Sequence, residues 1–161
     1  MKELILITCY WAHLIATALW IGGIIFILFF AMQSSRHVLG AESGKLMGDI
    51  SKRFTPAANL SIVTLVITGA VLAGLSRQYS GVAFLENNWS SALTVKSILV
   101  FGMVAVHFYR GLVLGSKIMR TTADTEKKSL QKLSINLVKV NFALGLLVLL
   151  ISGHLSILRG F

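Results

Sequence analysis

The sequence predicts an all-α integral membrane protein, a bundle of four transmembrane helices forming a single domain over residues 1–161. Hydrophobic residues make up 55% of the chain and charged residues only 13%, with a mean hydropathy of +0.79. A soluble domain of this size needs less apolar surface to build one core. The apolar residues also gather in segments that can cross a hydrocarbon layer of about 30 Å, which takes about 20 helical residues. These segments are about 4–31, 56–75, 91–118 and 133–158.

The first segment is expected to be kept as a transmembrane helix and not removed as a signal peptide. It follows a single basic residue, Lys2, and runs longer than the apolar core of a signal peptide. It also lacks the small-residue pattern of a cleavage site. Gly22 and Gly23 within it would permit the close approach of another helix.

A short amphipathic segment on the cytoplasmic surface is expected between the first two helices. The connection, about 33–55, is too long for a tight turn and mixes glycines with apolar residues such as Leu46 and Met47. Thr55 followed by Pro56 has the pattern of an N-cap with proline at the first helical position. We therefore expect the second helix to begin at Pro56.

The last two helices follow a loop with the aromatic residues Tyr79, Phe84 and Trp89, which are placed as interfacial aromatic residues would be. In the third helix, Gly111 and Gly115 form a small-xxx-small pair. Such a pair suits helix contact and would also permit a homo-oligomer. The sequence shows no convincing internal repeat.

The net charge of +9 is explained by membrane topology and requires no nucleic-acid partner. Basic residues gather in the first and third connections, whereas the middle one holds only Arg77. The positive-inside rule then predicts both termini and the 76–90 loop outside the cytoplasm. The expected location is a bacterial inner membrane. All six acidic residues lie outside the spans, which argues against a carboxylate-driven ion transporter. The basic residues of the first connection are Arg36, Lys45, Lys52 and Arg53, and those of the third connection are Lys117, Arg120, Lys127, Lys128 and Lys132.

Three histidines stand inside the apolar segments, where an ionisable side chain is costly. His107 is about 16 residues into its helix, so its short side chain reaches neither surface and needs a partner or a ligand. For His13 a structural alternative is a hydrogen bond to a helix carbonyl or to Thr17, Asn59 or Thr64. The three histidines are His13, His107 and His154.

Helical spacing places these histidines beside other chemically active side chains. Residues three and four apart share a helix face, so two stripes form. Because an ionisable stripe facing lipid would be costly, the stripe of the third helix should point into the bundle. The stripes are Cys9, His13 and Trp20 in the first helix, and Lys96, Met103, His107 and Arg110 in the third.

Imidazole is a ligand for both haem iron and copper, so two metal chemistries are open. Depth along the helices favours His13 with His154 as a facing pair, while His107 stays a ligand candidate for the same or a second haem. A copper site would use Cys9, His13 and His154, because Cu(I) prefers soft and imidazole ligands. His37, in the basic first connection, is expected to be solvated.

The stretch from His13 to Gly23, His-Leu-Ile-Ala-Thr-Ala-Leu-Trp-Ile-Gly-Gly, resembles the first helix of CopD-type membrane proteins and of HemJ-type protoporphyrinogen oxidases. In the third helix, Lys96 followed by His107 eleven residues later is similar to the HemJ pattern. The resemblance implies a b-type haem in a four-helix bundle, with His13, Lys96 and His107 as the carried-over positions. The Leu-Pro-Arg and Tyr-His elements of the HemJ type are replaced here by residues 27–33, which favours haem binding over porphyrinogen oxidation.

These observations predict a haem-b transmembrane cytochrome that carries electrons within or across the lipid bilayer, with a quinol or a redox protein as partner. The alternatives are a copper transport or resistance protein, and a HemJ-like membrane oxidoreductase that converts protoporphyrinogen to protoporphyrin. In the haem prediction, Arg110 pairs with a haem propionate and the charge of Lys96 tunes the reduction potential of the haem. The cofactor residues would be His13 and His107 as the preferred ligands and His154 as a third candidate, with Lys96, Arg110 and Trp20 around them.

Overall fold

The computed structural model describes residues 1–76 and 87–158, and over these residues the chain is helical without strands. Four helical spans are long and apolar enough to cross a membrane, which confirms the predicted all-α membrane fold class and agrees with a four-helix bundle. The chain divides into two compact units, Met1–Tyr79 and Ser80–Phe161, so the single domain stays a prediction. The four spans are Lys2–Leu39, Ser43–Gly74, Asn88–Arg120 and Asp124–Leu158.

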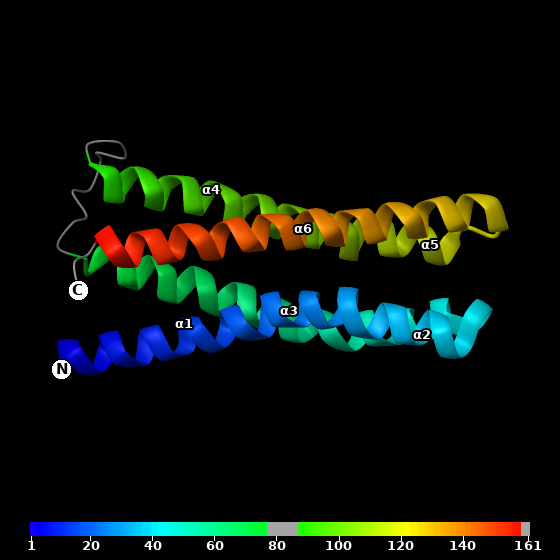
Figure 1. Cartoon of the computed structure of the whole chain (residues 1–161), viewed down its shortest axis with the longest axis horizontal. Helices are drawn as coiled ribbons and strands as arrows, with labels where there is room; N and C mark the ends of the chain where they lie inside the picture. The colour runs from blue at the N-terminus through cyan, green and yellow to red at the C-terminus, as the bar shows by residue number, and fades with distance from the viewer. Residues whose placement is uncertain (77–86, 159–161) are drawn as a thin grey trace. The chain divides into compact units, whose positions relative to one another are not determined.

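The first unit is a hairpin of two long helices (Figure 1). Helix α1, Lys2–Ile25, continues through a π-helical turn at Phe26–Ala31 into α2, Met32–Leu39. The chain then reverses in a 3₁₀ turn at Gly40–Glu42, where Gly40 has a φ of 50°. A glycine adopts this left-handed conformation without the steric cost that a Cβ would bring. Helix α3, Ser43–Gly74, returns antiparallel beside α1.

The prediction that the second helix begins at Pro56 is wrong. Helix α3 starts thirteen residues earlier, at Ser43, and runs through the proline, and the Thr55 hydroxyl donates to the Ser51 carbonyl and caps nothing. Exposed ion pairs one turn apart support this early part of the helix. A proline inside a helix removes one backbone hydrogen bond, a loss that long membrane helices tolerate. The ion pairs are Lys45 with Glu42 and Arg53 with Asp49.

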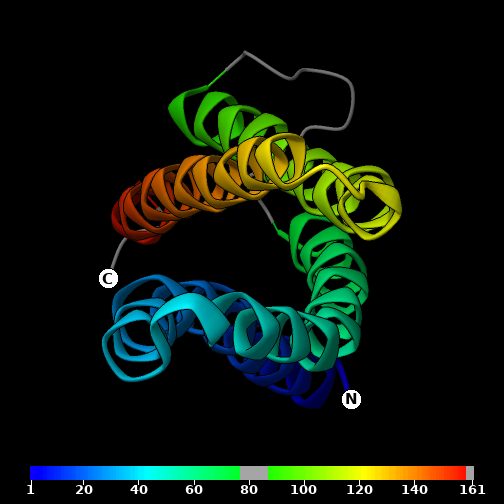
Figure 2. The same cartoon turned by 90° about the vertical axis from the view of Figure 1, so that its right-hand side faces the viewer.

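The amphipathic segment predicted between the first two helices is therefore shorter than expected. It corresponds to α2, which continues the first span without a break. In Figure 2 the cyan end of this hairpin, where α2 turns back into α3, faces the viewer.

The second unit is also a hairpin. Helix α4, Asn88–Phe108, begins at an N-cap in which the Asn87 side chain accepts the Ser90 N–H at 2.7 Å, three residues before the expected start. It passes through a π-helical turn, Tyr109–Leu114, into α5, Gly115–Arg120. After a short connection, α6, Asp124–Leu158, returns antiparallel beside α4 (Figure 1).

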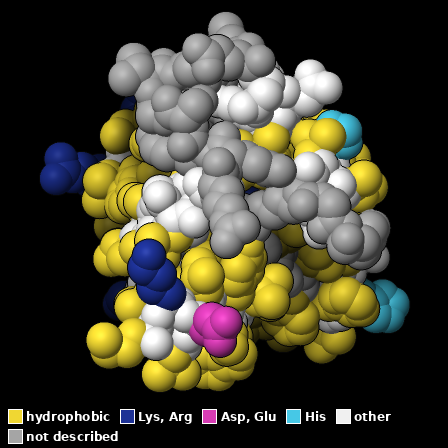
Figure 3. All heavy atoms as spheres, turned by 90° about the vertical axis from the view of Figure 1, so that its left-hand side faces the viewer, with side chains coloured by type: hydrophobic (Ala, Val, Ile, Leu, Met, Phe, Trp, Pro, Cys, Tyr) yellow, Lys and Arg dark blue, Asp and Glu magenta, His cyan; other side chains and the backbone are white. Residues whose placement is uncertain are grey.

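Of the three aromatic residues predicted at the outer interface, Trp89 is buried. Tyr79 and Phe84 lie outside the described residues. Figure 3 looks onto the end of the molecule near the N-terminus, where hydrophobic side chains dominate and charged ones are few.

The two hairpins share one order of elements, a repeat that the sequence did not reveal. Each has a long helix, a six-residue π-helical turn, a short helix, a tight connection and a long returning helix. A π-helical turn holds one residue more per turn than an α-helix, so it changes which side chains face the neighbouring helix. Because the side chains at equivalent positions differ, the repeat is visible in the backbone and not in the residue pattern.

Gly23 allows the first hairpin to pack, and Gly22 does not take part. A Cβ built at Gly23 would overlap the ring of Phe54 on α3, whereas a Cβ at Gly22 would meet no atom within 4 Å. Trp20, one turn earlier on α1, is 2% exposed. The close approach predicted for the glycine pair is thus confirmed at Gly23 alone.

We expect Gly23→Ala to destabilise the protein by about 1–3 kcal/mol, because it overpacks the contact with the aromatic ring. Gly22→Ala is the matched control and should leave the melting temperature unchanged or raise it, since alanine favours a helix by up to about 1 kcal/mol. Thermal unfolding in detergent measures both, and Phe54→Leu should rescue Gly23→Ala. Equal melting temperatures for the two alanine variants would contradict this packing.

Candidate functional site

His13 is held by a hydrogen bond across the first hairpin. Its Nδ1 lies 2.8 Å from the Thr68 hydroxyl on α3, and that hydroxyl lies 2.6 Å from the Thr64 carbonyl. A hydroxyl has a single hydrogen to donate, and Thr68 gives it to the carbonyl. Nδ1 of His13 is therefore the donor, and in the neutral ring the lone pair is on Nε2.

The ring of His13 also packs against the backbone of α3. A Cβ built at Gly69 would lie 3.6 Å from Cε1 of His13, in ordinary van der Waals contact. Helix α3 thus fixes both the tautomer and the position of the imidazole.

The hydrogen bond from the His13 ring to Thr68 is one that sequence reasoning did not name. The Thr17 hydroxyl donates to the His13 backbone carbonyl, and the Thr64 hydroxyl donates to the Leu60 carbonyl within its own helix. Thr68 was missed, although it follows Thr64 by four residues on the same face of α3. Only the register between α1 and α3 selects Thr68.

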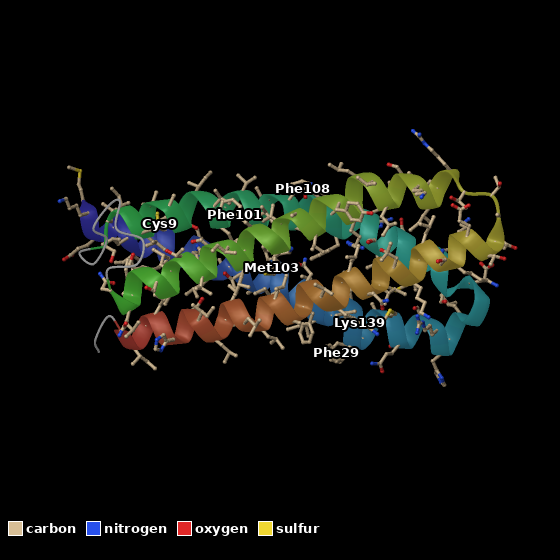
Figure 4. The ribbon with its side chains drawn as sticks, turned by 90° about the horizontal axis from the view of Figure 1, so that it is seen from above. Cys9, Phe29, Phe101, Met103, Phe108 and Lys139 are labelled. Carbon is tan, nitrogen blue, oxygen red and sulfur yellow. The ribbon has the colours of Figure 1, made fainter. Side chains whose placement is uncertain are left out.

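Cys9 lies one turn before His13 on α1, towards the N-terminus (Figure 4). It is a half-buried free thiol. Residues four apart on a helix have Cβ atoms about 5–6 Å apart, a separation that a single metal ion can bridge. The first unit therefore pairs a sulfur ligand with an oriented imidazole.

The second unit buries the other predicted histidine. His107 is 6% exposed and stands at the end of α4, with its ring edge against Phe108 at a centroid distance of 5.5 Å. Met103, one turn earlier, is 1% exposed. Figure 4 places Met103 between α4 and α6, on the opposite side of α4 from Phe101 and Phe108. Part of the predicted stripe on this helix therefore points inwards.

The remaining charged residues of the stripe are less deeply placed. Lys96 and Arg110 are half-buried, and Arg110 lies within the π-helical turn that follows His107. His154 and Lys139 on α6 are exposed, and Figure 4 shows Lys139 on the side of α6 away from α4. His37 on α2 is exposed, as expected for a solvated side chain.

Each unit brings together only part of the predicted site. Cys9, His13 and Trp20 belong to the first hairpin, and Lys96, His107, Arg110 and His154 to the second. The ligand pairs His13 with His107 and His13 with His154 would join the two units and stay predictions. Among residues 1–76 and 87–158, no three or more His, Cys, Asp and Glu side chains form a group that could hold a metal ion.

Comparison with protein families gives a match over residues 48–155, more than half of the chain, to the family described as copper resistance protein D, CopD. The chain belongs to the CopD family. Neither the curated proteins nor the solved structures contain a match. The matched residues include Thr68, Lys96 and His107 but begin after His13, and the match does not extend to the HemJ type. Of the two families in the predicted resemblance, CopD is the one confirmed.

Proposed function

We propose that this CopD-family protein handles copper in the membrane and binds Cu(I) at Cys9 and His13 on α1. The family description, copper resistance, supports the copper alternative of the sequence analysis over its haem prediction. The structural observation that carries the proposal is the hydrogen bond from His13 to Thr68. Histidines that bind metal almost always donate their other N–H to a fixed acceptor, which orients the ring and raises its basicity.

The ligand set suits Cu(I), which is cargo here and not a resident cofactor. Soft thiolates and imidazoles are preferred by this ion. Cys9 supplies the sulfur and His13 supplies Nε2, from neighbouring turns of one helix. His154, which helix depth predicted as a third ligand, belongs to the second unit and stays a prediction.

In the proposed orientation, Cys9 and His13 lie on the outer side of the membrane, so copper reaches this site from outside the cytoplasm. Cys9 and His13 lie in the first half of α1. The basic residues flank the turns at the other ends of the hairpins, between α2 and α3 and between α5 and α6. By the positive-inside rule those turns face the cytoplasm, and the metal pair lies in the outer leaflet.

Haem b is the second candidate ligand, and the burial of His107 favours it. A buried imidazole can be an axial ligand of haem iron, and half-buried Arg110 nearby could pair with a propionate. In that case the protein would transfer electrons between a quinol or redox protein and another partner. This candidate ranks second because the family is described by copper resistance.

The test is the metal content and visible spectrum of the detergent-purified protein. Titration with Cu(I) in competition with bicinchoninate should show tight binding of at least about one ion per chain. Expression in a copper-sensitive bacterial strain should change its copper tolerance. A protein that binds no Cu(I) but shows a Soret band and about one haem per chain would overturn the copper proposal in favour of the cytochrome.

A further inference from the structure

The second hairpin contains a buried polar atom that the fold leaves unsatisfied. Asn141 on α6 is 5% exposed, and its Oδ1 has no hydrogen-bond partner among the described residues. Buried polar groups in native proteins are nearly always hydrogen-bonded, because an unpaired one loses its water without compensation. An exception of this kind calls for an explanation, and one explanation is a ligand or a rearrangement that supplies the partner.

The register of the hairpin places Asn141 beside the buried stripe of α4. A Cβ built at Gly102 would lie 3.9 Å from the Leu144 side chain, so these two residues are at the same level of the antiparallel pair. Asn141 is then level with the turn between Met103 and His107, about 3 Å along the axis from each. Helical side chains lean towards their own N-terminus, so His107 and Asn141 lean towards each other.

We propose that Met103 and His107 form a second Cu(I) site, with the Asn141 amide oxygen accepting the N–H of the His107 ring when the metal is bound. This inference rests on the proposed copper function. Thioether sulfur and imidazole nitrogen are both ligands that Cu(I) favours. The amide oxygen is a hard atom, so it accepts a hydrogen bond from the imidazole and does not bind the metal.

The two hairpins would then contain sites of the same design. In each, a sulfur residue precedes a histidine by four positions on the outgoing helix, and a polar side chain on the returning helix accepts the ring N–H. In the first hairpin that acceptor is Thr68, and its hydrogen bond is formed. In the second it is Asn141, whose oxygen stays unpaired until the ring turns towards the metal.

The second site is the weaker of the two. Its ligands are neutral, whereas a Cys9 thiolate neutralises the charge of Cu(I). Arg110 follows His107 by three residues and adds positive charge near the metal. Weaker binding suits a site from which the ion moves on.

The experiment is a Cu(I) titration of the full-length protein in detergent, with bathocuproine as competitor. Wild-type protein should bind about two ions per chain, and His13→Ala should bind about one. Adding Met103→Leu to His13→Ala should remove the last ion, whereas adding Met119→Leu, a change at an exposed methionine of α5, should not.

Asn141→Leu tests the acceptor role, with Asn136→Leu at an exposed position of α6 as its control. We expect Asn141→Leu to weaken the second site by about 10–100-fold and to leave the melting temperature of the copper-free protein unchanged or higher. A lower melting temperature with both sites weakened equally would show a purely structural role and overturn the assignment.

The outcomes separate this inference from the proposed function. A wild-type protein that binds about one ion, lost in His13→Ala and unaffected by Met103→Leu, keeps the copper function and overturns the second site. A wild-type protein that binds no Cu(I) overturns both.

Discussion

Replacing His13 by alanine is expected to weaken Cu(I) binding at the first site by more than about 100-fold, since loss of a direct ligand should exceed the 10–100-fold loss of an outer-shell partner. The reason is that α3 orients this ring through Thr68, so the variant loses a ligand that is already positioned. Competition titration with bicinchoninate measures the loss, and X-ray absorption should show fewer nitrogen neighbours around copper.

The matched control for His13→Ala is His37→Ala. His37 is an exposed histidine on α2, and its loss should leave Cu(I) affinity unchanged. Cys9→Ser should reproduce most of the loss seen in His13→Ala, because serine lacks the soft sulfur. Full copper binding by His13→Ala with a normal melting temperature would remove His13 from the site.

Replacing Thr68 by valine is expected to lower Cu(I) affinity by about 10–100-fold while every direct ligand remains. Valine keeps the shape of threonine but cannot accept the N–H of His13. The ring then loses its fixed tautomer, and the half-buried donor loses this partner, which should also destabilise the protein by about 1 kcal/mol.

Two further variants separate the hydrogen bond from general packing. Thr68→Ser keeps the hydroxyl and should retain most of the affinity. Thr64→Val should have little effect on Cu(I) affinity. Thr64 accepts the Thr68 hydroxyl through its backbone carbonyl, which the variant keeps, and its own hydroxyl donates to the Leu60 carbonyl. If Thr68→Ser and Thr68→Val weakened copper binding equally, the hydrogen bond would have no part in the site.

Much of the fold could be predicted from local properties of the chain. The length and hydropathy of each segment are properties of consecutive residues, so the existence of four spans could be predicted. The second and fourth spans begin at Ser43 and Asp124, earlier than the predicted 56 and 133. The burial of His107 followed from its distance to both helix ends. Family membership could be anticipated from a few residues of the first and third helices, and the match over residues 48–155 confirms the CopD resemblance.

The errors arose where local rules compete with each other. Thr55 and Pro56 have the pattern of a helix start, yet α3 runs through them from Ser43. The exposed turns before the proline form a good helix, with ion pairs along one face, and the loss of one hydrogen bond does not stop a helix already formed. A local start signal therefore lost to the stability of the longer helix.

The sequence by itself determined that four apolar helical segments can span a membrane, because hydrophobic length is a property of consecutive residues. Only the tertiary structure decided that Thr68 is the partner of His13, that Phe54 covers Gly23, and that Asn141 is buried with an unpaired oxygen. Each of these depends on the axial register of two antiparallel helices. Register is set by the summed packing of whole helix faces and by the π-helical turns, and no single segment of sequence encodes it.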